Sequence, residues 1–483
     1  MKRVPVFGIS LLAAVIAVAQ APVGNEDYQA WKQAQALPVT APVHPQVHPE
    51  HQGHPPGTFR DDDDCACWIT PDPTYTTINN DSAWNASGWG NGDDGSFGPV
   101  TLPFSFMLYG QAYDQVYINI NGNISFGNYV YTFTASGFPM TGPAMIAPFW
   151  GDVDLRGNGT GTNIVQYKVT PTALFVNWTN VGYYSQHTDK TNSFQVIISD
   201  GTDPAIPGGN NVSFCFGGMQ WTTGDASGGS SGFGGAPATV GANMGDGLNY
   251  LQLGRFDHDS TDWDGPYDAA DGVAWLSDRH FSFSTASEDI SPIFTSIGCD
   301  TLEIEAGTSM DYPMMIIAGG PGQVITGTSQ CSGIANYVET VNTPGPVVDI
   351  LSTLAPTASE VGLHTINYTA VNDALPQVSS TYIIYVKVLP STAGVGEAVQ
   401  GDKLSLRPNP ATDKVSLSWP EGKRPALVQV IAVDGSVMLS QIPSPGKVQM
   451  ELNVEQLATG LYTVRAIGNT GASTIKLVRA ADR

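Results

Sequence analysis

The residue types best suited to chemistry gather in one acidic stretch, residues 257–272, where carboxylates alternate with Gly and Pro. Calcium prefers several hard oxygen ligands on a flexible loop. A calcium site is therefore one interpretation of this stretch, and its ligands would be Asp257, Asp259, Asp262, Asp264 and Asp268. The alternative, a solvated acidic loop, is the one we favour. The stretch contains no Glu, so it is not an EF-hand, whose last ligand is a bidentate Glu.

A second pair of carboxylates, Asp152 and Asp154, is two residues apart. On a strand both side chains would face the same side, which suits a second metal patch. The alternative, which we favour, is that they accept hydrogen bonds from the backbone of a turn. Paired carboxylates also serve acid/base hydrolysis at a defined separation. No motif here sets such a separation, so we predict no catalytic residue and no enzymatic activity.

Histidine is concentrated in a segment rich in Pro and Gln, residues 22–60. Extended His-rich tracts can bind zinc, copper or nickel, and the candidates here are His44, His48, His51 and His54. The alternative, a solvated spacer, is the one we favour. With the four adjacent carboxylates of residues 61–64, which are typical of an exposed loop, residues 20–64 are predicted to form a linker.

The N-terminus, residues 1–19, has the features of a secretory signal peptide. It begins Met1-Lys2-Arg3, continues with an apolar run to Val18 and offers small residues for cleavage. The alternative is a membrane anchor, but the run is short for a span. No other stretch of 18 or more apolar residues exists, so we predict a secreted chain without a transmembrane span.

Export permits disulfides, and the chain has five cysteines. Cys299 and Cys331 share one predicted domain, so we predict that they form a disulfide. Cys65 and Cys67 are too close together to favour pairing with each other, and either can pair with Cys215. Because the count is odd, at least one thiol stays free or pairs between chains.

Composition excludes some functions. Acids outnumber bases 44 to 20, for a net charge of −24, and phosphate binding needs clustered Lys and Arg, so nucleic acid is not a predicted partner. Hydrophobic residues make up 41% of the chain, enough for sizeable cores, while 54 Gly and 34 Pro favour turns and strands. Residues 401–483 differ from the rest, with ten Lys or Arg and seven Asp or Glu.

The pattern of alternating apolar residues predicts an all-β, modular protein. One strand, turn, strand signature surrounds Gly122-Asn123. We divide the chain into a β-sandwich-like domain at 65–286, an immunoglobulin-like sandwich at 287–390, a linker at 391–401 and a small β-sandwich at 402–483.

Five stretches of the first domain resemble, in order, those of the NIDO (nidogen-like) extracellular domain. The first reads Ala-Pro-Phe-Trp-Gly-Asp-Val-Asp-Leu-Arg, and the five occupy residues 147–156, 174–182, 192–198, 220–229 and 242–247. The resemblance implies an extracellular module associated with cell–matrix adhesion and brings no catalytic residue set. The implied partner is an extracellular matrix component, a surface glycan or a protein ligand.

The last block resembles the type A sorting domain of type IX secretion substrates. The similar segments are residues 404–410, 430–435, 457–464 and 476–478. The resemblance implies a Bacteroidetes-type bacterium, contact with the type IX secretion machinery, and release or attachment at the cell surface. An ordinary adhesive β-domain is the alternative. Together the patterns predict a secreted or surface-attached adhesion protein, with a secreted hydrolase or a glycan-binding protein as the competing hypothesis.

Overall fold

The computed structural model describes residues 25–42, 67–78, 92–157, 163–267, 270–297, 301–391, 404–420, 423–433, 436–444, 446–468 and 471–481. Several sequence predictions fall outside these ranges: the signal peptide, the four linker histidines, the acidic run at 61–64, Cys65, Asp268 and Cys299. No helix in the described part is long and apolar enough to cross a membrane. The predicted all-β fold is confirmed, and the chain divides into two compact units, residues 1–391 and 392–483.

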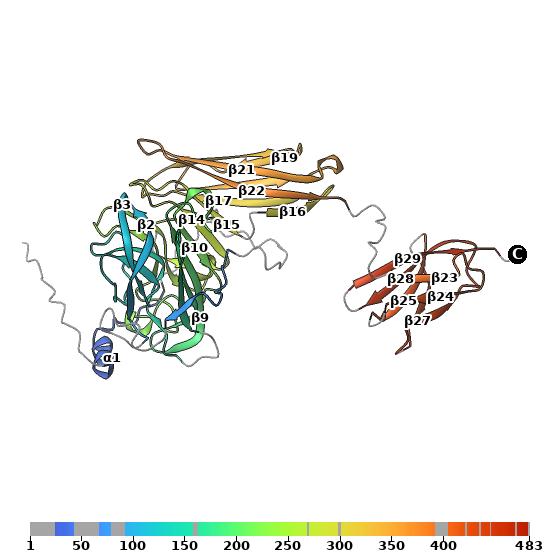
Figure 1. Ribbon diagram of the computed structural model, residues 1–483, viewed down its shortest axis with the longest axis horizontal. Coiled ribbons are helices and arrows are strands. Elements are labelled where there is room, and N and C mark those ends of the chain that lie inside the picture. Colours follow the sequence, from blue (N-terminus) through green and yellow to red (C-terminus); the bar gives the residue numbers. More distant parts are fainter. Residues whose placement is uncertain are drawn as a thin grey trace, which may run out of the picture. The chain divides into compact units, whose positions relative to one another are not determined.

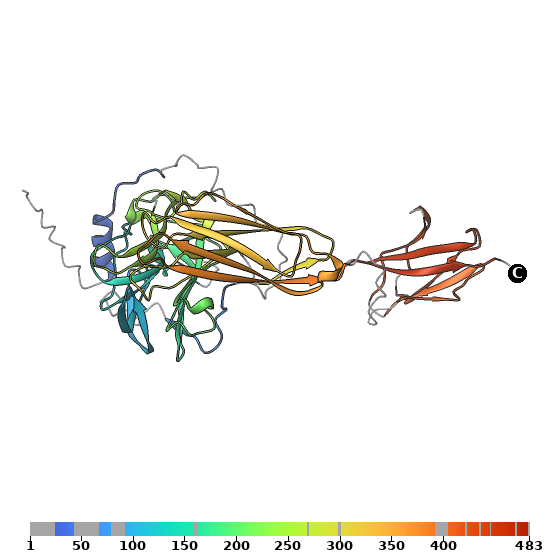
Figure 2. The ribbon, with the colours of Figure 1, turned by 90° about the horizontal axis from the view of Figure 1, so that it is seen from above.

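The first unit begins with a sandwich of two sheets (Figures 1 and 2). One has seven strands, in the order β13 (Asp271–Gly272), β12 (Tyr250–His258), β11 (Ala238–Asn243), β5 (Ala144–Trp150), β4 (Asn123–Phe126), β3 (Gln111–Asn119) and β2 (Ser96–Leu108). Nearly all of its pairings are antiparallel; β12 and β13 run parallel.

The facing sheet has eleven strands. Ten follow the order β1 (Thr76–Ile78), β7 (Ile164–Val169), β8 (Ala173–Tyr183), β9 (His187–Ser199), β10 (Val212–Phe216), β14 (Arg279–Phe283), β15 (Ile293–Ile297), β17 (Met310–Ile317), β20 (Val347–Leu354) and β19 (Tyr337–Val341). The eleventh, β6 (Val153–Asp154), pairs with β8.

Strand β5 shows how the sequence fills both faces of a sheet. Every one of its residues is buried. Ala144 and Ile146 point into the core between the two sheets, while Met145 and Ala147 point into a smaller cluster on the opposite face. Successive side chains of a strand point to opposite faces, so a continuous apolar run is what a strand covered on both sides requires.

The turn between β3 and β4 confirms the predicted strand, turn, strand signature. Gly122 has φ +73°, and a Cβ there would lie 1.9 Å from the carbonyl oxygen of Phe149. Only glycine satisfies both the left-handed backbone and this close approach.

A second core lies between the far end of the eleven-stranded sheet and a four-stranded sheet. The order of the latter is β16 (Thr301–Glu305), β22 (Ser379–Leu389), β21 (Gly362–Asn372) and β18 (Ile325–Ser332). The predicted boundary at 286/287 falls between β14 and β15, but Ile290, Ile293, Ile317 and Val347, which follow it, belong to the core of the first sandwich. The boundary does not interrupt the sheet, because β15 pairs with β14 on one side and β17 on the other.

The second unit is a small sandwich of its own. Its two sheets are β23 (Ser405–Arg407), β24 (Lys414–Ser418) and β27 (Gln449–Asn453), and β26 (Val437–Gln441), β25 (Leu427–Ala432), β28 (Gly460–Gly468) and β29 (Gly471–Arg479). A separate hydrophobic core lies within it.

Helices are short in the described part of the chain. Four are 3-10 turns, namely η4 (Pro207–Gly209), η5 (Asp225–Ser227), η6 (Val273–Leu276) and η7 (Ala358–Glu360). The α-helix α1 (Asn25–Ala34) falls inside the predicted linker, so the structure differs there. Both ribbon views show α1 (blue) at the outside of the first sandwich (Figures 1 and 2).

Candidate functional site

Helix α1 presents two buried polar side chains on one face. Tyr28 and Lys32 are four residues apart, the spacing that places side chains together on a helix, and both are almost wholly buried. Lys32 lies in the last turn, where a cation interacts favourably with the helix dipole. Gln and Ala are good helix formers, and α1 is held against the domain through the face that carries Tyr28 and Lys32.

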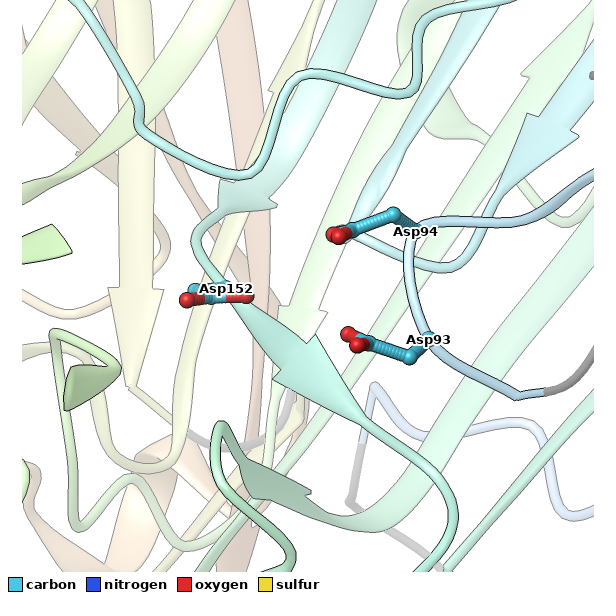
Figure 3. Close-up of side chains that lie close together, drawn as sticks. All are labelled: Asp93, Asp94 and Asp152. Atoms are coloured by element: carbon cyan, nitrogen blue, oxygen red, sulfur yellow. The ribbon is translucent and has the colours of Figure 1, made fainter. Parts of the chain in front are cut away.

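The Lys32 ammonium lies between three carboxylates. It is 2.9 Å from Asp93 Oδ1, 2.7 Å from Asp94 Oδ2 and 2.7 Å from Asp152 Oδ1, and all four side chains are fully buried. The aspartates come from the segment before β2 and the connection from β5 to β6, and their side chains turn toward a shared space (Figure 3). We call Lys32, Asp93, Asp94 and Asp152 the lysine socket.

Helix α1 contributes two further hydrogen bonds to the same carboxylates. The Tyr28 hydroxyl donates to Asp94 Oδ2, and Gln29 Nε2 donates to Asp93 Oδ2 at 2.9 Å. Three side chains of one helix therefore reach the same group of acids.

The domain surrounds the socket with its own polar groups. Asn121 Nδ2 donates to Asp94 Oδ1 at 2.7 Å, and Arg156 lies 3.0 Å from Asp93 Oδ2. Arg156 also pairs with Asp154 at 2.5 Å. Aspartates thus outnumber the cations near them.

Aromatic rings line the ammonium as well. The Lys32 nitrogen lies 4.1 Å from the ring centre of Tyr184 and 4.5 Å from that of Phe133. A cation over a ring face is attracted by the ring quadrupole, more strongly when water is excluded. The Tyr184 hydroxyl in turn accepts a hydrogen bond from Gln33 Nε2 at 3.1 Å.

Burial governs the protonation of the socket. It raises the pKa of Asp94 to about 6, with a contribution from the charge of Asp93, and raises the pKa of Asp152 well above its ordinary value. Burial alone would lower the pKa of Lys32, but the three carboxylates outweigh it and hold this pKa well above 10.5. Lys32 therefore stays charged, while burial and the neighbouring negative charge favour protons on Asp94 and Asp152.

The segment after α1 docks by backbone. Leu37 N donates to Ala226 O at 2.9 Å, Thr40 N donates to Gly228 O at 3.1 Å, and Gly235 N donates to Thr40 O at 3.1 Å. Residues 25–42 are thereby attached at two places, the lysine socket and the glycine-rich loop of residues 224–235.

Glycine is required in that loop because the docked chain passes so close. A Cβ on Gly234 would lie 2.2 Å from Thr40 O, and one on Gly228 would lie 2.7 Å from Pro38 O. A larger residue at either position would collide with the docked segment.

An open hollow of about 660 Å³ lies beside the docked segment. His187 Nε2 and Asp225 Oδ2 are 2.9 Å apart on its wall, and Asp189 accepts a hydrogen bond from the Tyr183 hydroxyl at 2.9 Å. The remaining lining residues include Val39 of the docked segment and the hydroxyls Thr188, Ser230 and Ser231. Such a lining can bind a polar ligand.

The predicted calcium loop is arranged around a histidine. His258 Nδ1 lies 2.5 Å from Asp257 Oδ1, and His258 Nε2 lies 3.0 Å from Asp262 Oδ1. Asp259 is exposed, and the Asp264 backbone N donates to Asp271 Oδ1. Within the described residues these acids form no group of three close donors. The calcium site here stays a prediction.

The second predicted pair, Asp152 and Asp154, separates into two roles. Asp154 accepts hydrogen bonds from the backbone N of Arg156 at 3.0 Å and of Gln186 at 2.9 Å, which confirms the favoured interpretation for this residue. Asp152 instead binds Lys32, as described above. Sequence reasoning missed its partners Lys32, Asp93 and Asp94.

The cysteines agree with one pairing and contradict another. Cys67 and Cys215 form a disulfide, one of the pairings left open. Cys331 is a free thiol, against the predicted disulfide with Cys299. Cys331 lies on β18, an edge strand of the four-stranded sheet. Cys299 itself is outside the described residues.

Comparisons with known proteins match two parts of the chain. Residues 69–262 match the family model described as NIDO related. Residues 405–480 match the model described as a secretion system C-terminal sorting domain. Both resemblances seen in the sequence are confirmed.

Curated relatives match about a third of the chain. Human alpha-tectorin is 34% identical over 187 residues, which is 33% of this chain and 8% of alpha-tectorin. Chicken alpha-tectorin is 33% identical over 187 residues, with the same shares. Nidogen of Drosophila melanogaster is 28% identical over 177 residues, 28% of this chain and 12% of nidogen. The chain thus spans about a tenth of the length of these relatives.

Proposed function

The chain carries a NIDO-related domain and a type IX secretion sorting domain that directs it to the cell surface or the extracellular space, and we propose that it is a non-catalytic adhesion protein. In this proposal the NIDO-related domain binds an extracellular matrix component, and the sorting domain is the part that the secretion machinery recognises. The observation that carries the proposal is the pairing of these two domains in one chain.

The arrangement of the acids supports a non-catalytic role. A general acid or base must come within hydrogen-bond reach of a substrate. Asp93, Asp94 and Asp152 are fully buried, and Lys32 fills the space between them. In this arrangement they hold the fold together and present no carboxylate to a substrate.

We assign ligand binding to the open hollow beside the docked segment. Its carboxylates Asp189 and Asp225, with the imidazole of His187, offer donors and acceptors toward solvent. This polar lining also favours the second candidate function, binding of a hydroxyl-rich glycan, over binding of an apolar ligand.

The test uses the purified full chain on immobilised matrix proteins and on a glycan array. Binding that is lost in Asp225→Asn and His187→Ala, and kept in the distant control Asp311→Asn, supports the proposal. Turnover of polysaccharide or peptide pools by the wild-type chain would contradict it. Binding to glycans alone selects the second candidate.

A further inference from the structure

We propose that the three aspartates of the lysine socket form a divalent-cation site. While α1 is docked, the Lys32 ammonium occupies this site in place of a metal ion. When α1 leaves, calcium takes the place of the ammonium. The proposal does not depend on the adhesive function.

The geometry of the carboxylates supports an ion. Asp93, Asp94 and Asp152 each offer an oxygen, and these atoms all lie within 4.8 Å of one another. They are the one such group among the residues that the structure describes. Calcium takes six to eight oxygens with tolerant geometry, and these aspartates supply three from two separate segments.

A cationic group already lies at the centre of these oxygens. The Lys32 nitrogen is 2.7–2.9 Å from one oxygen of each aspartate. This ammonium comes from a helix on a distant segment, not from the sandwich that holds the acids. The sandwich therefore provides the site, and α1 provides a removable occupant.

Two buried acceptors of the site have no hydrogen-bond donor in the structure. They are Asp152 Oδ2 and Asn121 Oδ1, and both residues are about 1% exposed. Asn121 already reaches into the socket, because its Nδ2 bonds to Asp94. Rotation of its amide would turn Oδ1 toward the same place, as a fourth oxygen ligand.

Withdrawal of α1 also creates the route by which an ion enters. The stem of Lys32 leaves with the ammonium, and so do the side chains of Tyr28 and Gln29, which bond to the same carboxylates. Three uncompensated carboxylates at this spacing are strongly unfavourable. A divalent cation with its remaining waters offsets two of these three negative charges. It occupies the place of the ammonium, so calcium binding and α1 docking are mutually exclusive.

The first experiment measures calcium binding by titration calorimetry on the full chain. Lys32→Met keeps the stem and removes the charge, and we expect it to bind calcium about tenfold or more tightly than the wild type. The matched control Lys168→Met removes a partly exposed lysine of the same domain and should change nothing. The double variant Lys32→Met/Asp152→Asn should lose this increase in calcium affinity.

A further control separates this site from the predicted loop. Lys32→Met/Asp262→Asn should keep the gain, because Asp262 bonds to His258 and not to the socket. Equal calcium affinity in Lys32→Met and wild type, or a gain that survives Asp152→Asn, overturns the proposal. If Lys32→Met is unfolded in chelator, refolding by calcium supports the proposal and its failure to refold overturns it.

A second experiment leaves the socket unmutated. A protease site placed within residues 43–66 lets the chain be cut after α1 without altering the site. In chelator the N-terminal fragment should remain bound on size exclusion, and calcium should release it where equal ionic strength of sodium chloride does not. Retention of the fragment in calcium counts against the proposal.

Discussion

The Lys32 nitrogen lies 2.7 Å from Asp152 Oδ1, across 120 residues of sequence, and both side chains are fully buried. This contact fastens an N-terminal helix to the strand connection at the centre of the NIDO-related domain. A buried pair of this kind contributes little net free energy compared with apolar packing, but losing one member leaves the other charge unpaired and costly. The stability of the domain thus depends on keeping Lys32 in place.

Lys32→Ala should destabilise the first unit strongly in the presence of chelator. Breaking a buried ion pair from one side costs about 3–5 kcal/mol, and here three carboxylates lose their shared cation. Urea denaturation, followed by tryptophan fluorescence, measures the loss. The control Lys168→Ala removes a more exposed pair with Asp72 and should change the free energy of unfolding far less. Equal effects would show that the socket contributes no special stability.

The contribution of the socket to the stability of the first unit should fall as the pH rises through about 6. Burial and the charge of Asp93 raise the pKa of Asp94 to about 6, above its unfolded value. The contribution of a carboxyl shifted upward is fully present below the unfolded pKa and is lost as the pH rises through the folded pKa. The free energy of unfolding of the first unit, measured in urea, should therefore be lower at pH 7.5 than at pH 4.5.

Asp94→Asn is the matched variant for this pH dependence, because an amide mimics the neutral carboxyl. It should flatten the change in the free energy of unfolding between pH 4.5 and 7.5. An unchanged pH profile in Asp94→Asn would mean that another group causes the effect.

The sequence predicted the sandwich better than it predicted the socket, for a physical reason. Strand signals are local: apolar runs, Gly122-Asn123 and the motif around Asp152 all show within a few residues. The socket joins Lys32 to acids 61, 62 and 120 residues away, and no local pattern encodes such a contact. The sequence did contain one signal that pointed to Lys32 of the socket, because Lys32 is the single Lys or Arg between residues 4 and 59.

Cysteine pairing was also hard to predict, because it depends on contacts between residues far apart in the sequence. The sequence left Cys67 with Cys215 as one possibility, and the structure selects it. The predicted pair Cys299 with Cys331 rested on shared domain membership, which does not determine strand order. β16 and β18 lie close together in the sequence, yet they form opposite edges of the four-stranded sheet.

His258 should make stability fall as the pH rises above neutral. Burial would lower its pKa, but hydrogen bonds to Asp257 and Asp262 outweigh burial and raise it above 6.5. Its contribution is fully present below the unfolded pKa and is lost as the pH passes the folded pKa. The free energy of unfolding of the wild type minus that of His258→Gln should therefore decrease between pH 6 and pH 9. A difference that stays constant over this range would contradict the ion-pair assignment.

Removal of the Cys67–Cys215 disulfide should lower the free energy of unfolding by about 2–5 kcal/mol, because the bond closes a long loop, with a sequence separation of 148. Cys215→Ser tests this in urea, and Cys331→Ser is the control for losing a free thiol. Peptide mapping without reduction should recover Cys67 linked to Cys215 and Cys331 alkylated. A peptide linking Cys331 to Cys299 would contradict the structure.

Gly234→Ala should detach the segment around Thr40 from the glycine-rich loop. The added Cβ would lie 2.2 Å from Thr40 O, and the backbone there has φ +78°. Gly110 shares the same φ and has nothing within 4 Å of its Cβ position, so Gly110→Ala carries the backbone strain without the collision. Limited proteolysis of residues 37–42 should accelerate in Gly234→Ala and stay slow in Gly110→Ala. Similar rates in the two variants would mean that backbone strain alone, and not contact with the docked segment, accounts for the glycine at 234.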